Sequence, residues 1–485
     1  MDRKLFVNYI YNILFQVTKF ALTFFLVPYT MGHLGESILG ISDYASSICG
    51  WFVLVGLLGV STYGIREIGK VRDNKEKLSL YFSEIFIMQL CNIAIVFVLF
   101  VLYIELFVTD NKMIYLLYCI NIIGFGMDIT WFYYGIENFK IVSIRNIIVK
   151  LISVVLTIAI VKEPADLWKF VLINTSTNLI TQAYTYLGLK KYITFKKVSI
   201  KQAYKNHFLG SASLFIPTIP LSIYVLLNQT MLGAMIDDKG SVALFKTAQS
   251  FITMFLYFIT SIGSVVMPRI ANVYTKEDSH KEINKYINST FNLAIILSIP
   301  MMFAMMAVSP NFFPWYLPLQ SDAMIKLVQF SCPIIVLISI TDVFGTQYLI
   351  PTGRTKDLTI SVVVGFVVNI LVNLITIRYW KEIGATIGYI CAEITIAVVQ
   401  WTYVKENIRI HYSKTLIKSL VSSIVMSLAV LITGSLLEST IVNNMIQAII
   451  GLLVYVIMML ILRENMILRI KSSIFNRNNR ENNHD

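Results

Sequence analysis

Long apolar stretches follow one another along this chain, and they constrain its fold more than any other feature. Of the 485 residues, 56% are hydrophobic and 14% are charged, whereas soluble domains carry about 25% charged residues. A helix needs about 20 apolar residues to cross the hydrocarbon core of a bilayer. The sequence therefore predicts an all-α integral membrane protein. About fourteen stretches have the required length: 7–30, 37–62, 80–106, 113–136, 143–162, 168–189, 209–236, 242–267, 290–310, 323–350, 358–379, 383–404, 415–437 and 441–462.

The basic residues between these stretches predict an orientation. With the N-terminus placed in the cytoplasm, 30 of the 40 Lys and Arg fall on the cytoplasmic side and six on the other side. Cytoplasmic loops of membrane proteins carry such an excess. We therefore expect a multi-pass protein with both termini in the cytoplasm, and the net charge of +12 does not call for a nucleic-acid partner. The remaining four lysines lie inside stretches: Lys19, Lys150, Lys246 and Lys326.

The sequence lacks the common motifs of nucleotide and zinc sites. It contains no GxxxxGK[ST] phosphate loop, no HExxH and no CxxC pair, and these spacings are what nucleotide and zinc sites need. All five cysteines lie within apolar stretches, where free cysteine behaves as a small hydrophobic residue. We expect no metal, no cofactor, no catalytic residue and no ATP-driven pumping by this chain alone. The chain is expected to be a transporter and not an enzyme.

An internal repeat relates two of the stretches. Residues 38–67 align without gaps on residues 241–270, with five identities in thirty positions. Both segments follow a short turn and end at a basic residue, Arg66 or Arg269. Two six-helix halves followed by two further helices are a transporter architecture, in which the halves move about a central site. The same offset of 203 residues places Asp43 over Lys246.

The first stretch carries a polar face along its whole length. Six polar residues recur there at spacings of four, four, three, four and seven residues, and such spacings fall within a sector of roughly 80° on a helix. This face cannot contact lipid tails. Its members are Asn8, Asn12, Gln16, Lys19, Thr23 and Thr30.

Charged residues also occur inside several other stretches. An ionised side chain at mid-membrane costs roughly 2.5–3.5 kcal/mol on insertion scales, so such residues face one another or water. The cations and their polar neighbours fit an anionic head group, the acids fit ion coupling or charge balance, and the two arginines that end the repeats fit a cytoplasmic gate. The predicted head-group residues are Lys19, Arg145, Lys150, Lys246, Asn12 and Gln16. The predicted coupling or balancing acids are Asp43, Asp128, Asp342 and Glu393, and the predicted gate residues are Arg66 and Arg269.

Structural interpretations of the same residues stay open at this point. Neutral polar faces often serve only to hold helices together. Lys19 and Lys150 could form structural ion pairs, and Lys246 and Lys326 could extend to the membrane surface. Asp43 could equally be structural.

Two blocks of sequence resemble the polysaccharide flippase family, also called Wzx-type oligosaccharide-lipid transporters. The first block comprises "NYIYN", "VPYTMGHLGESILGI" and "LGVSTYGIREIGKVRDNKEKLS". The second comprises "FGTQYLIPTGRTKDLTISVVVGFVVNILVN" and "IGATIGYICAEIT". The residues that match the family motifs are Pro28, Tyr29, Gly32, Gly35, Gly40, Arg66, Gln347, Pro351 and Gly353. Asn228 departs from the pattern, because many relatives carry an acid there.

The resemblance implies a fold of the MATE superfamily. It implies two pseudo-symmetric six-helix lobes in a V shape, residues 1–200 and 201–408, then two helices in residues 409–463 and a basic, polar cytoplasmic tail in residues 464–485. The tail is expected to be solvated, and its Arg and Lys could rest on anionic membrane lipids.

The resemblance also implies a function in the bacterial cytoplasmic membrane. The cargo would be an undecaprenyl-pyrophosphate-linked oligosaccharide repeat unit for capsule or O-antigen, moved by alternating access through a charged cavity. A polysaccharide polymerase of the same pathway is a possible partner, and the coupling ion, H⁺ or Na⁺, is left open. Three alternatives remain: a MATE-like exporter of small molecules, a flippase for lipid II, and a membrane polymerase or glycosyltransferase.

Overall fold

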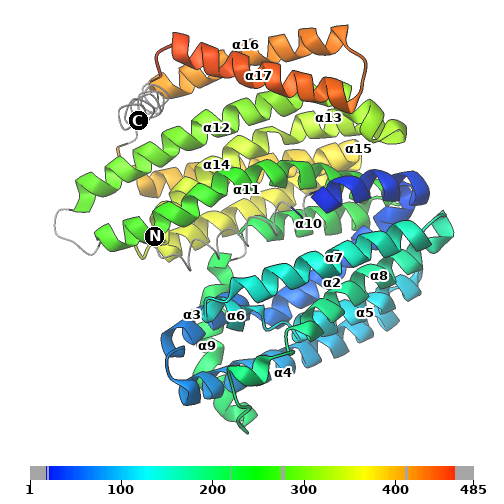
Figure 1. Cartoon of the computed structure of the whole chain (residues 1–485), viewed down its shortest axis with the longest axis vertical. Helices are drawn as coiled ribbons and strands as arrows, with labels where there is room; N and C mark the ends of the chain where they lie inside the picture. The colour runs from blue at the N-terminus through cyan, green and yellow to red at the C-terminus, as the bar shows by residue number, and fades with distance from the viewer. Residues whose placement is uncertain (1–17, 19–20, 219, 275–278, 410–412, 465–485) are drawn as a thin grey trace, which may run out of the picture. The chain divides into compact units, whose positions relative to one another are not determined.

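The computed structural model describes residues 18, 21–218, 220–274, 279–409 and 413–464 (Figure 1). Within these ranges every regular element is a helix, which agrees with the predicted all-α class. Of the first predicted stretch, 7–30, the structure describes a helix over Ala21–Leu34. Asn12, Gln16 and Lys19 lie outside the described residues.

Ten helical segments of the described chain are long and apolar enough to cross a membrane. The longest helix, α15 (Thr355–Val404), contains a non-helical residue, Lys381 (φ 45°, ψ −121°). This kink separates the two predicted stretches 358–379 and 383–404. The chain is thus a multi-pass membrane protein, while the count of fourteen spans stays a prediction.

The predicted stretches 37–62 and 113–136 each form two helices in the structure. The stretch 37–62 forms α2 (Glu36–Leu57) and α3 (Val60–Val71), separated by Leu58 and Gly59 in left-handed conformation (φ 41° and 76°). The stretch 113–136 forms α5 (Lys112–Gly126) and α6 (Thr130–Gly135). The stretch 209–236 overlaps α9 (Ile200–Thr218) and α10 (Pro220–Met235), and residue 219 between them lies outside the described residues.

The contacts between residues divide the chain into two compact units, Met1–Lys246 and Thr247–Asp485. This division falls inside α11 (Gly240–Tyr274) and differs from the predicted lobe boundary at residue 200, which stays a prediction. The other elements of the first unit are α4 (Lys75–Phe107), α7 (Phe139–Ile160), η1 (Pro164–Asp166), α8 (Leu167–Tyr184) and η2 (Leu189–Lys191). The second unit adds α12 (Ser279–Tyr316), η3 (Pro318–Gln320), α13 (Ser321–Ser331), α14 (Pro333–Phe344), η4 (Gly345–Leu349), α16 (Ser413–Leu436) and α17 (Ile441–Ile461).

The packing of α17 shows how these helices suit lipid. Large apolar side chains on one face are more than half exposed, among them Val442, Met445, Ile449 and Leu452. The opposite face buries Asn444, Gln447, Gly451, Tyr455 and Met459, and this face packs on α12 and α16. The polar groups are inside and the apolar groups outside, because lipid tails solvate leucine and valine but offer nothing to an amide. Figure 1 shows α16 and α17 side by side.

The first unit has its own core where α3, α4 and α6 meet. Phe82, Trp131 and Phe132 are at most 2% exposed there, and the Phe82 ring contacts both of the others at 5.5 and 5.1 Å between centroids. Asn74 fixes the start of α4, because its side chain accepts hydrogen bonds from the backbone N–H groups of Glu76 and Lys77. Such capping satisfies donors that a helix start leaves unpaired. Tyr63 on α3 belongs to the same core.

Candidate substrate and ion-coupling sites

An ion pair joins α2 to the first turns of α11. Lys246 Nζ donates to Asp43 Oδ1 at 2.5 Å. The two residues are 203 positions apart, so the positions that the repeat makes equivalent carry the two partners of one ion pair. The lysine side chain is 43% exposed and the aspartate side chain 15% exposed. The pair therefore lies at an opening and not in closed packing.

That opening is a pocket of about 240 Å³. It lies between α2, α5, α8 and α11, within the first compact unit. Apart from the ion pair, its lining is largely neutral and polar. The lining residues are Ser42, Asp43, Ser46, Tyr118, Asn121, Phe170, Val171, Asn174, Thr175 and Lys246.

Arg145 on α7 is a buried cation with spare hydrogen-bonding capacity. Arg145 is 3% exposed, and its Nε and Nη2 both donate to Asn146 Oδ1, at 3.2 and 2.9 Å. Its buried Nη1 has no hydrogen-bond partner in the described part of the chain. An unpaired donor on a buried charged group costs more than the ~1–3 kcal/mol of a neutral one, so this nitrogen is suited to an anion.

Two other residues of the predicted sites, Asp128 and Lys150, lie next to α5 and on α7. Asp128 Oδ1 accepts a hydrogen bond from the backbone N–H of Thr130 at 2.8 Å, and Gln89 Nε2 donates to the Asp128 carbonyl at 2.9 Å. Asp128 therefore stabilises the break between α5 and α6, which adds a structural role to the predicted one. Lys150 on α7 is half-buried.

The predicted acids of the second unit lie on neighbouring helices. Glu393 on α15 is 4% exposed and accepts a hydrogen bond from Thr341 Oγ1 at 3.3 Å. Asp342, which follows Thr341 on α14, accepts a hydrogen bond from Gln347 Nε2 at 2.9 Å. In the described ranges, neither carboxylate has a Lys or Arg nitrogen within 4.0 Å. Gln347 belongs to η4, a π-helical turn, and such turns are frequent at functional sites.

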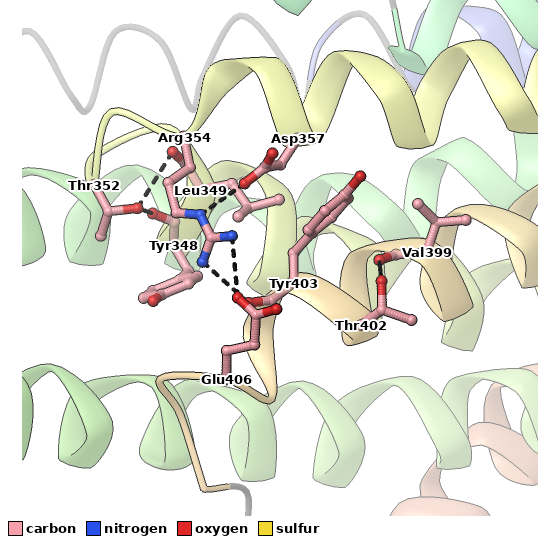
Figure 2. A network of polar contacts seen from close by, with 9 residues as sticks. All are labelled: Tyr348, Leu349, Thr352, Arg354, Asp357, Val399, Thr402, Tyr403 and Glu406. Carbon is pink, nitrogen blue, oxygen red and sulfur yellow. Dashed lines mark hydrogen bonds and ion pairs between the residues drawn. The ribbon is translucent and has the colours of Figure 1, made fainter.

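A polar network fixes the chain where this π-helical turn leads into α15 (Figure 2). Arg354 Nε donates to Asp357 Oδ2 at 2.6 Å, and Nη1 donates to the Tyr403 carbonyl at 3.0 Å. Nη2 lies 3.6 Å from Glu406 Oε2. Burial opposes the charge of the guanidinium, but the hydrogen bond and charge of Asp357 outweigh it, so the pKa of Arg354 lies above its ordinary value. Arg354 thereby ties both ends of α15 together.

The comparisons with known proteins agree with this fold. Residues 5–274 match the polysaccharide biosynthesis protein family, and residues 214–375 match the MatE family. The first match covers more than half of the chain. The chain belongs to the polysaccharide biosynthesis protein family.

Two relatives in this comparison carry the name "Putative O-antigen transporter". The one from Escherichia coli (strain K12) is 22% identical over an alignment of 416 residues that covers 82% of this chain and 96% of the relative. The one from Shigella dysenteriae is 25% identical over an alignment of 397 residues that covers 79% of this chain and 96% of the relative. The similarity therefore extends over nearly the full length of both transporters.

Solved structures of transporters share the fold. A lipid II flippase, MurJ, in an inward closed conformation covers 98% of this chain and 99% of its own, with a TM-score of 0.75 and 17% identity. An inward-facing multidrug MATE transporter gives a TM-score of 0.59 at 11% identity, covering 81% of this chain and 94% of its own. The eukaryotic MATE transporter AtDTX14 gives 0.56 at 14% identity, covering 86% and 97%. These likenesses place the family member in the fold shared by MATE transporters and MurJ.

The predicted gate residues have different surroundings. Arg66 is exposed and donates from Nε to Glu67 Oε1 at 2.9 Å, and Lys70 donates to the same oxygen. Arg269 is an exposed residue of α11. Their role as a gate stays a prediction.

One buried polar cluster was missed in the sequence. His207 on α9 lies between Tyr63 on α3 and Glu84 on α4. Its Nδ1 is 2.8 Å from the tyrosine hydroxyl, and its Nε2 is 2.7 Å from Glu84 Oε2. Glu84 was recognisable as an acid inside an apolar stretch. His207 was overlooked because the predicted helix began at residue 209, whereas α9 begins at Ile200.

Across the residues that the structure describes, no three His, Cys, Asp or Glu side chains lie close enough together to bind a metal ion.

Proposed function

We propose that this chain is a flippase that moves undecaprenyl-pyrophosphate-linked oligosaccharide repeat units across the bacterial cytoplasmic membrane. The observation that carries the proposal is membership of the polysaccharide biosynthesis protein family, with full-length similarity to two relatives named as O-antigen transporters. The chain works as a transporter and not as an enzyme, with both termini in the cytoplasm. The cargo serves assembly of a surface polysaccharide, and a polymerase of that pathway is the proposed partner.

The physical task is to carry a pyrophosphate and its sugars through hydrocarbon. An ionised phosphate cannot be buried without partners, since desolvation of a charge is far more costly than that of a neutral polar group. Arg145 supports the proposal because its buried Nη1 is available to an anion. Arginine also matches phosphate oxygens through several N–H groups at once. Lys150 lies on the same helix, and Lys19, Asn12 and Gln16 belong to the proposed head-group set.

Coupling to an ion gradient belongs to the proposal as well. Asp342 and Glu393 have hydroxyl and amide partners rather than cations, which suits carboxylates that take up and release H⁺ or Na⁺ during the cycle. Asp43 and Asp128 balance nearby charge. Arg66 and Arg269 close the cytoplasmic side in alternating access between two lobes.

The test uses a strain that lacks the chain. Mass spectrometry of its lipid-linked intermediates should show the complete repeat unit on undecaprenyl pyrophosphate, while surface polysaccharide is lost. We expect Arg145→Ala to restore little polysaccharide, Arg145→Lys to restore part of it, and Lys201→Ala, at an exposed lysine of α9, to restore it fully. Protein levels are measured for each variant.

Other outcomes select one of the alternatives. Accumulation of lipid II would identify a lipid II flippase. Drug sensitivity with normal intermediates would identify a small-molecule exporter, and formation of a product by the purified chain would identify an enzyme.

A further inference from the structure

We propose that the pocket between α2, α5, α8 and α11 is a sugar-binding subsite that recognises one neutral monosaccharide unit of the cargo, and not its pyrophosphate. The inference rests on the proposed function and adds to it a separate place for the sugar. It also reassigns Lys246, which the sequence analysis placed among the residues for the anionic head group.

Charge is the first argument. Lys246 Nζ already has a carboxylate oxygen of Asp43 at 2.5 Å, so the two charges of the pocket neutralise each other. An anion that approached the ammonium would also approach the carboxylate of Asp43, and like charges repel. A sugar hydroxyl meets no such repulsion, because it can donate to the carboxylate and accept from the ammonium.

The neutral lining is the second argument. Asn121 and Asn174 place amide groups on facing helices, α5 and α8, and Ser46 adds a hydroxyl from α2. An amide offers both donors and an acceptor, which matches the vicinal hydroxyls of a pyranose. Phe170 and Tyr118 supply aromatic surface in the same pocket, and an aromatic ring can pack against the apolar C–H face of a sugar.

Existing hydrogen bonds hold this lining in place. Asn178 Nδ2 donates to Asn121 Oδ1 at 2.7 Å. Asn174 Nδ2 donates to the Phe170 carbonyl at 2.9 Å, which directs the amide oxygen of Asn174 to other partners. The hydroxyls of Ser42 and Tyr118 lie 3.0 Å apart. Side chains oriented before binding reduce the entropy that a ligand must overcome.

Size and position are the third argument. The pocket volume of about 240 Å³ is below the roughly 300–1,000 Å³ of sites for drug-sized ligands, so it suits a single ring. Asp43 and Lys246 each lie about two turns from the start of their helices, Glu36 and Gly240. The subsite is therefore close to the membrane surface at which these helices begin, where the sugar head of a glycolipid must pass.

The experiment compares two ligands on one purified protein in lipid nanodiscs. The first is the lipid-linked repeat unit extracted from the strain that accumulates it, and the second is undecaprenyl pyrophosphate without sugar. We expect Asn174→Ala and Phe170→Ala to weaken binding of the glycolipid at least tenfold and to change binding of the sugar-free lipid less than twofold. Thr175→Val, in the pocket, is matched with Thr177→Val, two residues further along α8 and outside the lining; only the first should weaken the glycolipid.

A second measurement tests the charge argument and does not depend on sugar. Asp43→Asn removes the neutralising carboxylate, so the variant should bind inorganic pyrophosphate at least fivefold more tightly than the unmodified chain. Equal loss for both lipids in Asn174→Ala, no loss for either, or no gain in pyrophosphate binding by Asp43→Asn overturns the sugar subsite. If these results occur while the unmodified chain still binds and flips the glycolipid, the proposed function stands and the subsite alone is wrong. If the unmodified chain does not distinguish glycolipid from sugar-free lipid and flips neither, both proposals are wrong.

Discussion

The buried cluster of Tyr63, His207 and Glu84 gives the sharpest test of how polar groups stabilise this membrane protein. The side chains of Glu84 and His207 are 2% and 4% exposed, and each carboxylate oxygen has one donor. His207 Nε2 lies 2.7 Å from Oε2 and donates to it in the tautomer whose Nδ1 accepts from Tyr63, and Asn206 Nδ2 donates to Oε1 at 3.1 Å. We predict that His207→Leu destabilises the fold by about 3–5 kcal/mol, because breaking a buried pair leaves a charged group without its partner.

The double variant distinguishes pairing from simple packing. Replacing both members of a buried pair with apolar residues of similar volume is often close to neutral. In His207→Leu/Glu84→Met, Tyr63 and Asn206 each lose a partner. The buried Tyr63 hydroxyl adds a penalty of about 1–3 kcal/mol when it is left unsatisfied, whereas Asn206 is exposed and adds no such penalty. We therefore expect the double variant to lose less stability than the sum of the single variants, with an interaction free energy of about 1–3 kcal/mol.

The assay is unfolding of the purified protein in mixed micelles as the mole fraction of sodium dodecyl sulfate is raised, followed by tryptophan fluorescence. His33→Leu is a matched control: His33 is partly exposed, and its Nδ1 is 2.9 Å from the carbonyl of Tyr29. This control should cost about 0.5–1.5 kcal/mol, the value of an ordinary hydrogen bond. Additive losses in the cycle, or equal losses for His207→Leu and His33→Leu, would refute the reasoning, because the carboxylate would then not depend on the histidine.

Three further predictions follow from single positions. Gly40→Ala should prevent recovery of folded protein on size-exclusion chromatography, because the new Cβ atom would lie 1.7 Å from the Lys239 carbonyl oxygen. Gly32→Ala should be tolerated, because a Cβ atom at that position meets no atom within 4 Å. A hydrogen bond from Lys169 lowers the pKa of Asp166, so the stability that this bond contributes is present at neutral pH and is lost as the pH falls below about 3.9. Asp166→Asn should therefore flatten the decrease in melting temperature at acid pH. A pH profile of thermal stability that does not change in this variant would contradict the prediction. Arg354→Gln should lower the free energy of unfolding by about 1.5–3 kcal/mol through loss of its charge-assisted hydrogen bonds. Lys356→Ala, two residues away, should change the free energy of unfolding by less than about 0.5 kcal/mol. Equal effects of the two variants would show that the Arg354 network does not stabilise the turn.

Some features of the candidate sites could be read in the sequence and others could not. The offset of the repeat connected Asp43 with Lys246, and the structure joins them. The same reasoning assigned Lys246 to an anion, because composition shows that a cation is present and not that its charge is already neutralised. Glu84 and His207 lie 123 positions apart, and no local pattern relates them.

The sequence by itself determined the class of the protein, the approximate positions of its membrane helices and the family to which it belongs. These properties are sums over neighbouring residues, since transfer of a segment into lipid depends on its own side chains. Only the tertiary structure decided where α2 and α3 separate at Leu58 and Gly59, which acids have cations beside them, and which polar groups enclose a pocket. Those outcomes depend on which helices pack together, and that choice is made by contacts between residues far apart in the chain.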